Sequence, residues 1–290
     1  MSPWWRGRAE ASAPIRSTHL MGRPPHKVMG IVNVTPDSFS DGGEWFAPAA
    51  AVAHGHELVA EGADILDVGG ESTRPGAEPV GVEEELRRVV GVVEGLAGSG
   101  AQLSVDTMKV RVAEAAIAAG ATFVNDVTAF RHDPGMAALV AEHGCDCCLM
   151  HMLGEPRTMQ DDPRYDDVVD DVKAFLAERA AFAVAEGIPA ARVHLDPGIG
   201  FGKTVQHNLE LLERLGEIVA LGFPVLVGTS RKGFLGQLTG EADPRRRIAG
   251  TIATNVLALE RGARVFRVHD VAPVREALTV AAAALAAPRS

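Results

Sequence analysis

Eight short apolar runs recur along this chain, separated by segments rich in alanine and leucine with helical spacing. The runs lie near residues 28–33, 64–68, 102–106, 122–126, 146–151, 193–196, 225–229 and 264–268. Strands that alternate with single helices form a parallel sheet. The pattern therefore predicts an α/β fold, a single (β/α)8 TIM barrel with its active site at the C-terminal ends of the strands.

The length of 290 residues suits one such barrel, for which roughly 250 residues is typical. We expect residues 26–288 to form the barrel domain. Residues 1–25 hold arginines, prolines and Trp4-Trp5 without a long apolar run, and we expect a flexible lead-in there. A doubly wound open sheet is the alternative. Its dinucleotide-binding form carries Gly-x-Gly-x-x-Gly after a strand, and no predicted strand here is followed by that turn.

Local signals mark where helices begin and end. Asp133-Pro134 and Asp243-Pro244 predict helix starts, because Asp caps a helix and proline is favoured at the first helical position. Gly120, Gly144 and Gly262 fall at predicted helix ends.

The charge of the chain bears on its partners. A net charge of −10 argues against a nucleic-acid partner, which requires a basic face. Arg245-Arg246-Arg247 is the densest basic run, and we expect it to be the solvated first turns of a helix. No apolar stretch approaches the ~20 residues of a membrane span. We therefore expect no membrane partner and a cytoplasmic location.

The three cysteines, Cys145, Cys147 and Cys148, crowd into one predicted strand. Neighbouring residues on a strand point to opposite faces, so a disulfide framework is not expected. A metal site built from His143, Cys145, Cys147 and His151 is an alternative, although a Cys-x-Cys pair on a strand lacks the turn of common zinc sites. We interpret the cysteines as core thiols, because free cysteine behaves as a small buried hydrophobe.

Polar side chains stand at nearly every predicted strand end, where barrel enzymes place their functional groups. These ends carry Asn33, Asp67, Asp106, Asn125-Asp126, His151, Asp196, Ser230-Arg231-Lys232 and Arg267-Val268-His269. A single Asp at such a place can be only a helix cap, but the whole set indicates a ligand site. Acceptors (Asp106, Asn125, Asp196) and cations or donors (Arg74, Arg231, Lys232, Arg267, His269) suit a ligand with a flat hydrogen-bonding edge and a polyanionic end.

Over about Val28 to Ala272 the chain resembles the dihydropteroate synthases. The phrases that carry the resemblance occur in the family's order: Asn33-Val-Thr-Pro-Asp-Ser-Phe-Ser-Asp-Gly-Gly, Gly70-Glu-Ser-Thr-Arg-Pro-Gly76, Ser104-Val-Asp-Thr107, Asn125-Asp-Val127, Met150-His-Met152, Asp196-Pro-Gly-Ile-Gly-Phe-Gly-Lys203, Thr229-Ser-Arg-Lys232 and Arg267-Val-His269. The resemblance implies a transferase of folate biosynthesis. Such an enzyme joins 6-hydroxymethyl-7,8-dihydropterin diphosphate to 4-aminobenzoate, which yields 7,8-dihydropteroate and diphosphate. The family is a barrel of this kind, is inhibited by sulfonamides and usually forms homodimers.

The resemblance also implies roles for individual residues. Asn33 would ligate Mg²⁺ on the diphosphate. Pterin diphosphate would be bound by Thr73, Asp106, Asn125, Asp196, Lys232, Arg267, Val268 and His269. The 4-aminobenzoate would be bound by Pro75, Phe201, Lys232 and Gly233. Asp41 and Arg74 would pair and close two loops over the site.

The chemistry of the residues agrees with these roles. A pterin edge offers an amino group and ring N–H donors, which carboxylates and an asparagine accept, and its carbonyl oxygen calls for a donor such as Lys232. Charge develops on the leaving diphosphate, so cations and the alignment of the two substrates should account for catalysis. An aniline attacks as the neutral amine and needs no nucleophilic side chain.

Other functions remain open. A methyltetrahydrofolate-dependent corrinoid methyltransferase shares the pterin acceptors, but it has no diphosphate for Asn33, Arg74, Arg267 and His269 to hold. A non-catalytic pterin-binding paralogue would lose some of those residues. A Schiff-base aldolase using Lys232 or Lys203 is the third alternative. Gly233 also departs from the serine that many relatives have, which affects the expected affinity for aminobenzoate.

Overall fold

Eight parallel strands pair side by side in the computed structural model, which describes residues 26–34, 43–72, 76–154 and 158–287. Their order is β6-β5-β4-β3-β2-β1-β8-β7. The strands are β1 (Lys27–Asn33), β2 (Ile65–Gly69), β3 (Gln102–Asp106), β4 (Phe123–Asp126), β5 (Asp146–Met150), β6 (Val193–Asp196), β7 (Leu226–Val227) and β8 (Val265–Val268). A parallel bridge between Leu195 and Val225 closes the sheet. The predicted barrel is confirmed, and the open-sheet alternative is wrong.

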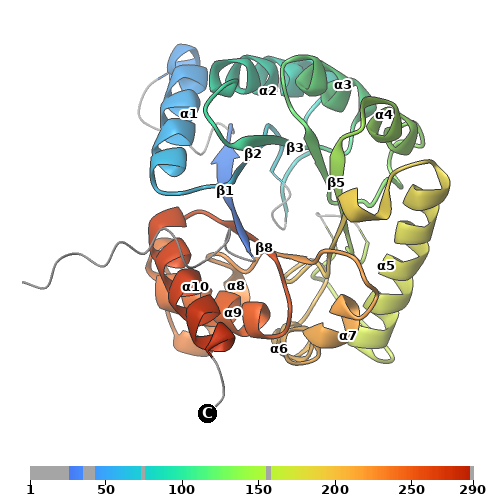
Figure 1. Cartoon of the computed structure of the whole chain (residues 1–290), viewed down its shortest axis with the longest axis vertical. Coiled ribbons are helices and arrows are strands. Elements are labelled where there is room, and N and C mark those ends of the chain that lie inside the picture. Colours follow the sequence, from blue (N-terminus) through green and yellow to red (C-terminus); the bar gives the residue numbers. More distant parts are fainter. Residues whose placement is uncertain (1–25, 35–42, 73–75, 155–157, 288–290) are drawn as a thin grey trace, which may run out of the picture.

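Helices surround the strands, as Figure 1 shows. They are α1 (Gly43–Ala60), α2 (Val82–Leu96), α3 (Val110–Ala118), α4 (Met136–His143), α5 (Val168–Ala185), α6 (Val205–Glu213), α7 (Leu215–Val219), α8 (Gly233–Thr239), α9 (Ile248–Glu260) and α10 (Val271–Ala286). Within the described ranges, none of these helices combines the length and apolar character that a membrane crossing needs. The predicted lead-in, residues 1–25, lies outside the described residues.

Several predicted boundaries differ from the structure. Asp133-Pro134 was predicted to start a helix, but α4 begins at Met136 with Gly135 as its N-cap, and Asp133 Oδ1 accepts from the Gly135 N–H at 3.1 Å. Strand β7 ends at Val227, short of the predicted residue 229; beyond it, the Thr229 hydroxyl accepts from the Thr254 hydroxyl of α9 at 2.8 Å. Asp243 caps a three-residue 3-10 helix, Pro244–Arg246, and α9 begins only at Ile248. The helix ends at Gly120, Gly144 and Gly262 are confirmed, since all three glycines have positive φ angles.

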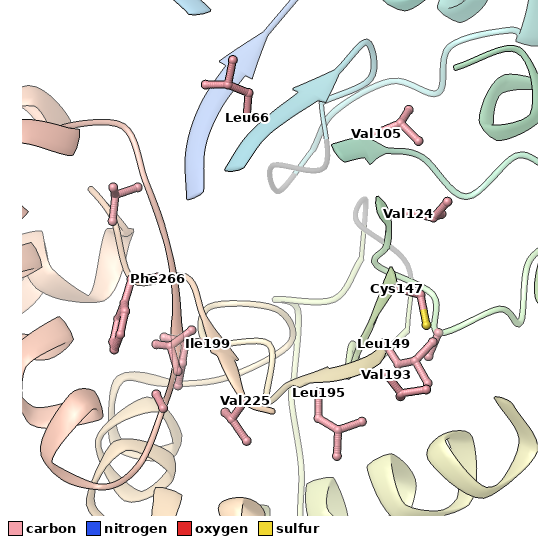
Figure 2. Packing of buried hydrophobic residues seen from close by; sticks show 14 of the residues in the cluster. Leu66, Val105, Val124, Cys147, Leu149, Val193, Leu195, Ile199, Val225 and Phe266 are labelled. Atoms are coloured by element: carbon pink, nitrogen blue, oxygen red, sulfur yellow. The ribbon is translucent and has the colours of Figure 1, made fainter. Parts of the chain in front are cut away.

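Alternation along the strands divides the core into two parts. Figure 2 shows Leu66, Val124 and Phe266 pointing away from the barrel axis, toward the helices. These residues belong to the large apolar cluster between strands and helices. Their neighbours on the strands form a separate buried cluster of Met29, Ile65, Phe123, Cys148, Leu226 and Val265. Because successive strand residues face opposite sides, this second cluster fills the barrel interior.

The cysteines follow the same alternation. Cys147 packs in the outer cluster, and Cys148 packs in the interior cluster. Burial raises the pKa of both thiols and that of Cys145. All three are buried free thiols, as the interpretation as core thiols expects.

Helices α1 and α2 approach closely through glycines. A Cβ at Gly55 of α1 would lie 2.6 Å from Leu96 Cδ2, and a Cβ at Gly95 of α2 would lie 2.6 Å from Val52 Cγ2. Gly91, one turn earlier on α2, has no atom within 4 Å of its Cβ position. The two glycines of one helix therefore separate helix propensity from packing.

We expect opposite results from alanine at these two positions. Gly91→Ala should raise the free energy of unfolding by about 1 kcal/mol, because alanine is the better helix former. Gly95→Ala gains the same propensity but forces Val52 to move, which costs about 1–3 kcal/mol. Urea unfolding should therefore place Gly95→Ala below Gly91→Ala by about that amount. Equal stabilities would show that the helices separate without cost.

Candidate active site

A cavity of 1840 Å³ opens at the carboxyl ends of the strands. It brings together most of the residues that the sequence predicts for the site: Asn33, Asp106, Asn125, Asp196, Phe201, Lys232, Gly233, Arg267 and His269. Asp41, Thr73, Arg74 and Pro75 lie outside the described residues. The nine residues in the cavity come from six different strand ends, as expected for a barrel enzyme.

Val268 is the exception among the described candidates. Its side chain is fully buried in the outer apolar cluster, on the face of β8 opposite to Arg267. Only its backbone can reach a ligand in the cavity, so the predicted contact is restricted to main-chain atoms.

A buried network of charges forms the floor of the cavity. The Arg267 guanidinium donates from Nε to Asp67 Oδ2 at 2.6 Å and from Nη2 to Asp106 Oδ2 at 2.8 Å. Asp67, which is fully buried, also accepts from Ser104 Oγ at 2.5 Å and from Asn125 Nδ2 at 3.0 Å. One of the two N–H groups of the Asn125 amide is thereby used, and its oxygen is left to accept from a ligand.

Ionisation in this floor follows from burial and charge. Burial raises the pKa of Asp106 to about 7, although the Arg267 guanidinium acts in the opposite direction. Burial also acts to lower the pKa of Arg267, but the carboxylates of Asp67 and Asp106 outweigh it and raise that pKa. The guanidinium is therefore a permanent cation, and the Asp106 carboxyl can change charge near neutrality.

Asp196 and Lys232 are two further ionisable residues of the cavity. Asp196 Oδ1 accepts from the Gly198 N–H at 2.7 Å, and burial raises the pKa of Asp196. Burial lowers the pKa of Lys232 to about 8, with Asp196 opposing the shift. Lys232 Nζ donates to the Ile199 carbonyl and stands 4.6 Å from the centroid of the Phe201 ring. Lys232 thus lies between Asp196 and Phe201 in the cavity.

The ends of β7 and β8 are joined by side chains. Ser230 Oγ lies 3.0 Å from His269 Nδ1 and accepts from the His269 N–H at 3.1 Å. The Arg231 guanidinium donates to both carboxylate oxygens of Asp270, at 2.9 and 2.5 Å. The sequence groups Arg231 with the cations for a polyanion, but a bidentate carboxylate partner already neutralises it.

Asn33 is the predicted metal ligand. It ends β1 beside Gly69 of β2, is half-buried and lines the cavity. Among residues 26–34, 43–72, 76–154 and 158–287 no three His, Cys, Asp or Glu side chains gather into a metal-binding group. Mg²⁺ keeps several waters and often takes only one or two protein ligands plus substrate phosphates. A single neutral oxygen at this place fits such an ion.

Sequence reasoning gave no role to some residues of the site. Asp67 was predicted only as a strand end, because its partner Arg267 is 200 residues further along the chain. Met159 and Gln160, which line the cavity from the connection between β5 and α5, carry no motif signal. Side chains on a strand alternate between its two faces, so Asp67 lies on the same face as Ile65, inside the barrel. That alternation is the signal that could have placed Asp67 in the site.

Removal of the Asp67 charge tests the floor network. Asp67→Asn keeps the shape but takes one anion from a buried pair, and we expect the free energy of unfolding to fall by about 3 kcal/mol. Asp64→Asn is the matched control, because Asp64 pairs with Arg275 with 38% of its side chain exposed. That control should lose about 1 kcal/mol or less. Denaturant unfolding that shows equal losses would contradict a special role for Asp67.

Comparisons with known proteins agree with this geometry. The family model described as "Pterin binding enzyme" matches residues 29–269. The chain is 46% identical to the dihydropteroate synthase of Neisseria meningitidis serogroup C over 278 residues, which cover 95% of each protein. The structure resembles that of Xanthomonas albilineans dihydropteroate synthase with 4-aminobenzoic acid, with a TM-score of 0.86 and 53% identity over 91% of this chain and 94% of that one.

A second Xanthomonas albilineans structure, in complex with 7,8-dihydropteroate, matches with a TM-score of 0.82 and 50% identity over 91% of this chain and 95% of that one. The likeness thus extends over most of both chains and includes the cavity described above. The chain belongs to the pterin binding enzyme family and, within it, to the dihydropteroate synthases.

Proposed function

We infer that the cavity at the carboxyl end of the barrel joins 6-hydroxymethyl-7,8-dihydropterin diphosphate to 4-aminobenzoate. The bond between the pterin methylene carbon and the diphosphate oxygen breaks, and its electron pair leaves with diphosphate. The aniline nitrogen forms the new bond to that carbon and loses a proton, which yields 7,8-dihydropteroate. The observation that carries this conclusion is the meeting of pterin acceptors and cations in one cavity of a dihydropteroate synthase chain.

The pterin binds against the buried floor. Asp106, Asn125 and Asp196 are each at most 8% exposed, and their oxygens accept from the ring N–H and amino donors. Lys232 donates to the ring carbonyl. Burying these groups without partners is unfavourable, so a ligand that pairs them gains affinity and selectivity together.

The diphosphate lies at the side of the cavity formed by β1 and β8. Arg267 and His269 face it, and Ser230 fixes His269 through two contacts. Asn33 is the ligand that we propose for Mg²⁺, which when bound neutralises charge on the leaving diphosphate. Thr73 and the backbone of Val268 complete our proposed contacts to this end of the substrate.

The aminobenzoate lies between Phe201, Lys232 and Gly233, with Pro75 as the fourth proposed contact. Its neutral amine attacks without a nucleophilic side chain, so alignment of the two substrates is the main task of the protein. Asp41 and Arg74 are proposed to close over the site. A barrel domain of residues 26–288, a homodimer and a cytoplasmic location complete the proposal, and they rest on the family resemblance and on composition.

Diphosphate release tests the reaction. Release should require both substrates, stop with EDTA and return with Mg²⁺. Release without 4-aminobenzoate would indicate a hydrolase. Binding of pterin without any release would indicate a non-catalytic pterin binder.

Asp196→Asn should weaken pterin diphosphate binding at least about tenfold and leave binding of free diphosphate nearly unchanged, because a buried charged partner is lost.

The control for that variant is Asp146→Asn. Asp146 begins β5 at the opposite end of the barrel and accepts from Gln102 Nε2 at 2.7 Å. Its replacement should leave pterin diphosphate binding unchanged. The contrary result in calorimetry would be that Asp196→Asn weakens the binding of free diphosphate as strongly as that of pterin diphosphate. In that case Asp196 does not recognise the pterin.

Gly233 tests the aminobenzoate side. It is the first residue of α8, lines the cavity, and has no atom within 4 Å of its Cβ position, so a serine fits without strain. Its hydroxyl would add one hydrogen bond to the aminobenzoate carboxylate, worth roughly 1 kcal/mol near solvent. Gly233→Ser should lower the KM for 4-aminobenzoate about fivefold and leave the KM for pterin diphosphate unchanged. Gly91→Ser, on α2, is the control, and a change confined to the pterin KM would contradict the assignment.

A further inference from the structure

The loop that carries Phe201 is held by its carbonyl oxygens. Every carbonyl from Gly198 to Gly202, here the 198–202 loop, accepts a hydrogen bond. The donors are Phe201 N–H to Gly198 at 3.0 Å, Lys232 Nζ to Ile199, Gln160 Nε2 to Gly200 at 2.7 Å, Lys203 Nζ to Phe201 at 3.0 Å and the Tyr165 hydroxyl to Gly202 at 2.7 Å. Four of these donors are side chains, so tertiary contacts fix the conformation of the loop.

The same loop is pressed against the segment that follows β5. Gly198 has a φ of 67°, and a Cβ there would lie 1.8 Å from the His151 carbonyl oxygen. The Phe201 ring rests on a buried cluster of Val127, Met150, Met152 and Met159. The Phe201 ring therefore packs on apolar side chains, and the Phe201 carbonyl accepts from Lys203.

Lys203 is an unusual residue for this position. Its side chain is almost completely buried, with 3% of the residue exposed. In the described part of the chain it forms no ion pair; its Nζ contacts His151 Nδ1 and the Phe201 carbonyl, both at 3.0 Å. Burial lowers the pKa of His151 to about 3, so the imidazole is neutral and can accept from the amine.

A buried lysine is retained at a cost, because burial disfavours its charged form and lowers the pKa of Lys203 to about 7. Its amine lies within hydrogen-bond distance of His151 and the Phe201 carbonyl, on the wall of the cavity. What the amine does hold is the backbone of the residue that lines the aminobenzoate slot.

We propose that Lys203 is a positioning residue that fixes the Phe201 backbone, and with it the width of the aminobenzoate slot, through its bond to the Phe201 carbonyl and its seat on His151. This proposal rests on the proposed function, because that function assigns the slot. Tyr165 supports the same loop one residue further on, at Gly202. Lys232 Nζ also stands 4.6 Å from the centroid of the Phe201 ring.

Lys203→Met tests the proposal, because methionine keeps an unbranched stem and removes both donations. The KM for 4-aminobenzoate should rise roughly three- to tenfold, as expected for one lost hydrogen bond, while the KM for pterin diphosphate changes less than about twofold. Tyr165→Phe removes only the bond to Gly202 and should change the same constant in the same direction by a smaller factor. Lys173→Met, which removes a surface lysine paired with Asp170, is the control and should change neither constant.

The outcomes separate the proposal from the proposed function. Wild-type protein without diphosphate release that depends on 4-aminobenzoate would overturn the function itself. Active wild type, with Lys203→Met raising both KM values equally or changing only the melting temperature, would overturn the positioning role. If Lys203→Met does not fold, Tyr165→Phe decides: a selective rise in the aminobenzoate KM supports the hold on the loop, and unchanged constants refute it.

Discussion

The contact of Arg267 with Asp67 and Asp106 is the interaction on which the site depends. It joins β8 to β2 and β3 inside the barrel, directly above the apolar interior cluster. Without the guanidinium, two carboxylates would face each other in a space with little water, and mutual repulsion would add to the cost of burial. With it, the floor is a preorganised set of oxygens, and no substrate is needed to assemble it.

The position of this floor follows from strand alternation. Ile65, Phe123 and Val265 belong to the interior cluster, and two residues later on the same strands stand Asp67, Asn125 and Arg267. Because side chains repeat with a period of two, each polar residue lies on the interior face, one layer nearer the carboxyl end. The barrel thus changes from apolar packing to a charged floor over one layer of side chains.

This periodicity explains what the sequence could and could not predict. The alternation of apolar runs and helical segments was enough for the fold, and the strand ends were enough to collect Asp106, Asn125, Asp196 and Arg267 in one cavity. The partner of Asp67 was not predictable, because the stagger between neighbouring strands decides which interior residues meet. The sequence of a single strand does not reveal that stagger. Val268 shows the opposite case. Its motif suggested a ligand contact, whereas the period of two puts its side chain among the helices.

Lys232 links the two halves of the cavity. Its ammonium carries three donors, of which the Ile199 carbonyl occupies one in this structure. The amine can therefore keep its hold on the 198–202 loop and still donate to a pterin carbonyl. The backbone that precedes Lys232 is also held in place. Thr229 accepts from the Thr254 hydroxyl of α9, and the Arg231 N–H donates to the Thr251 hydroxyl of the same helix. The proposed pterin contact and the hold on the 198–202 loop thus share one side chain, and the residues on either side of it are bonded to helix α9.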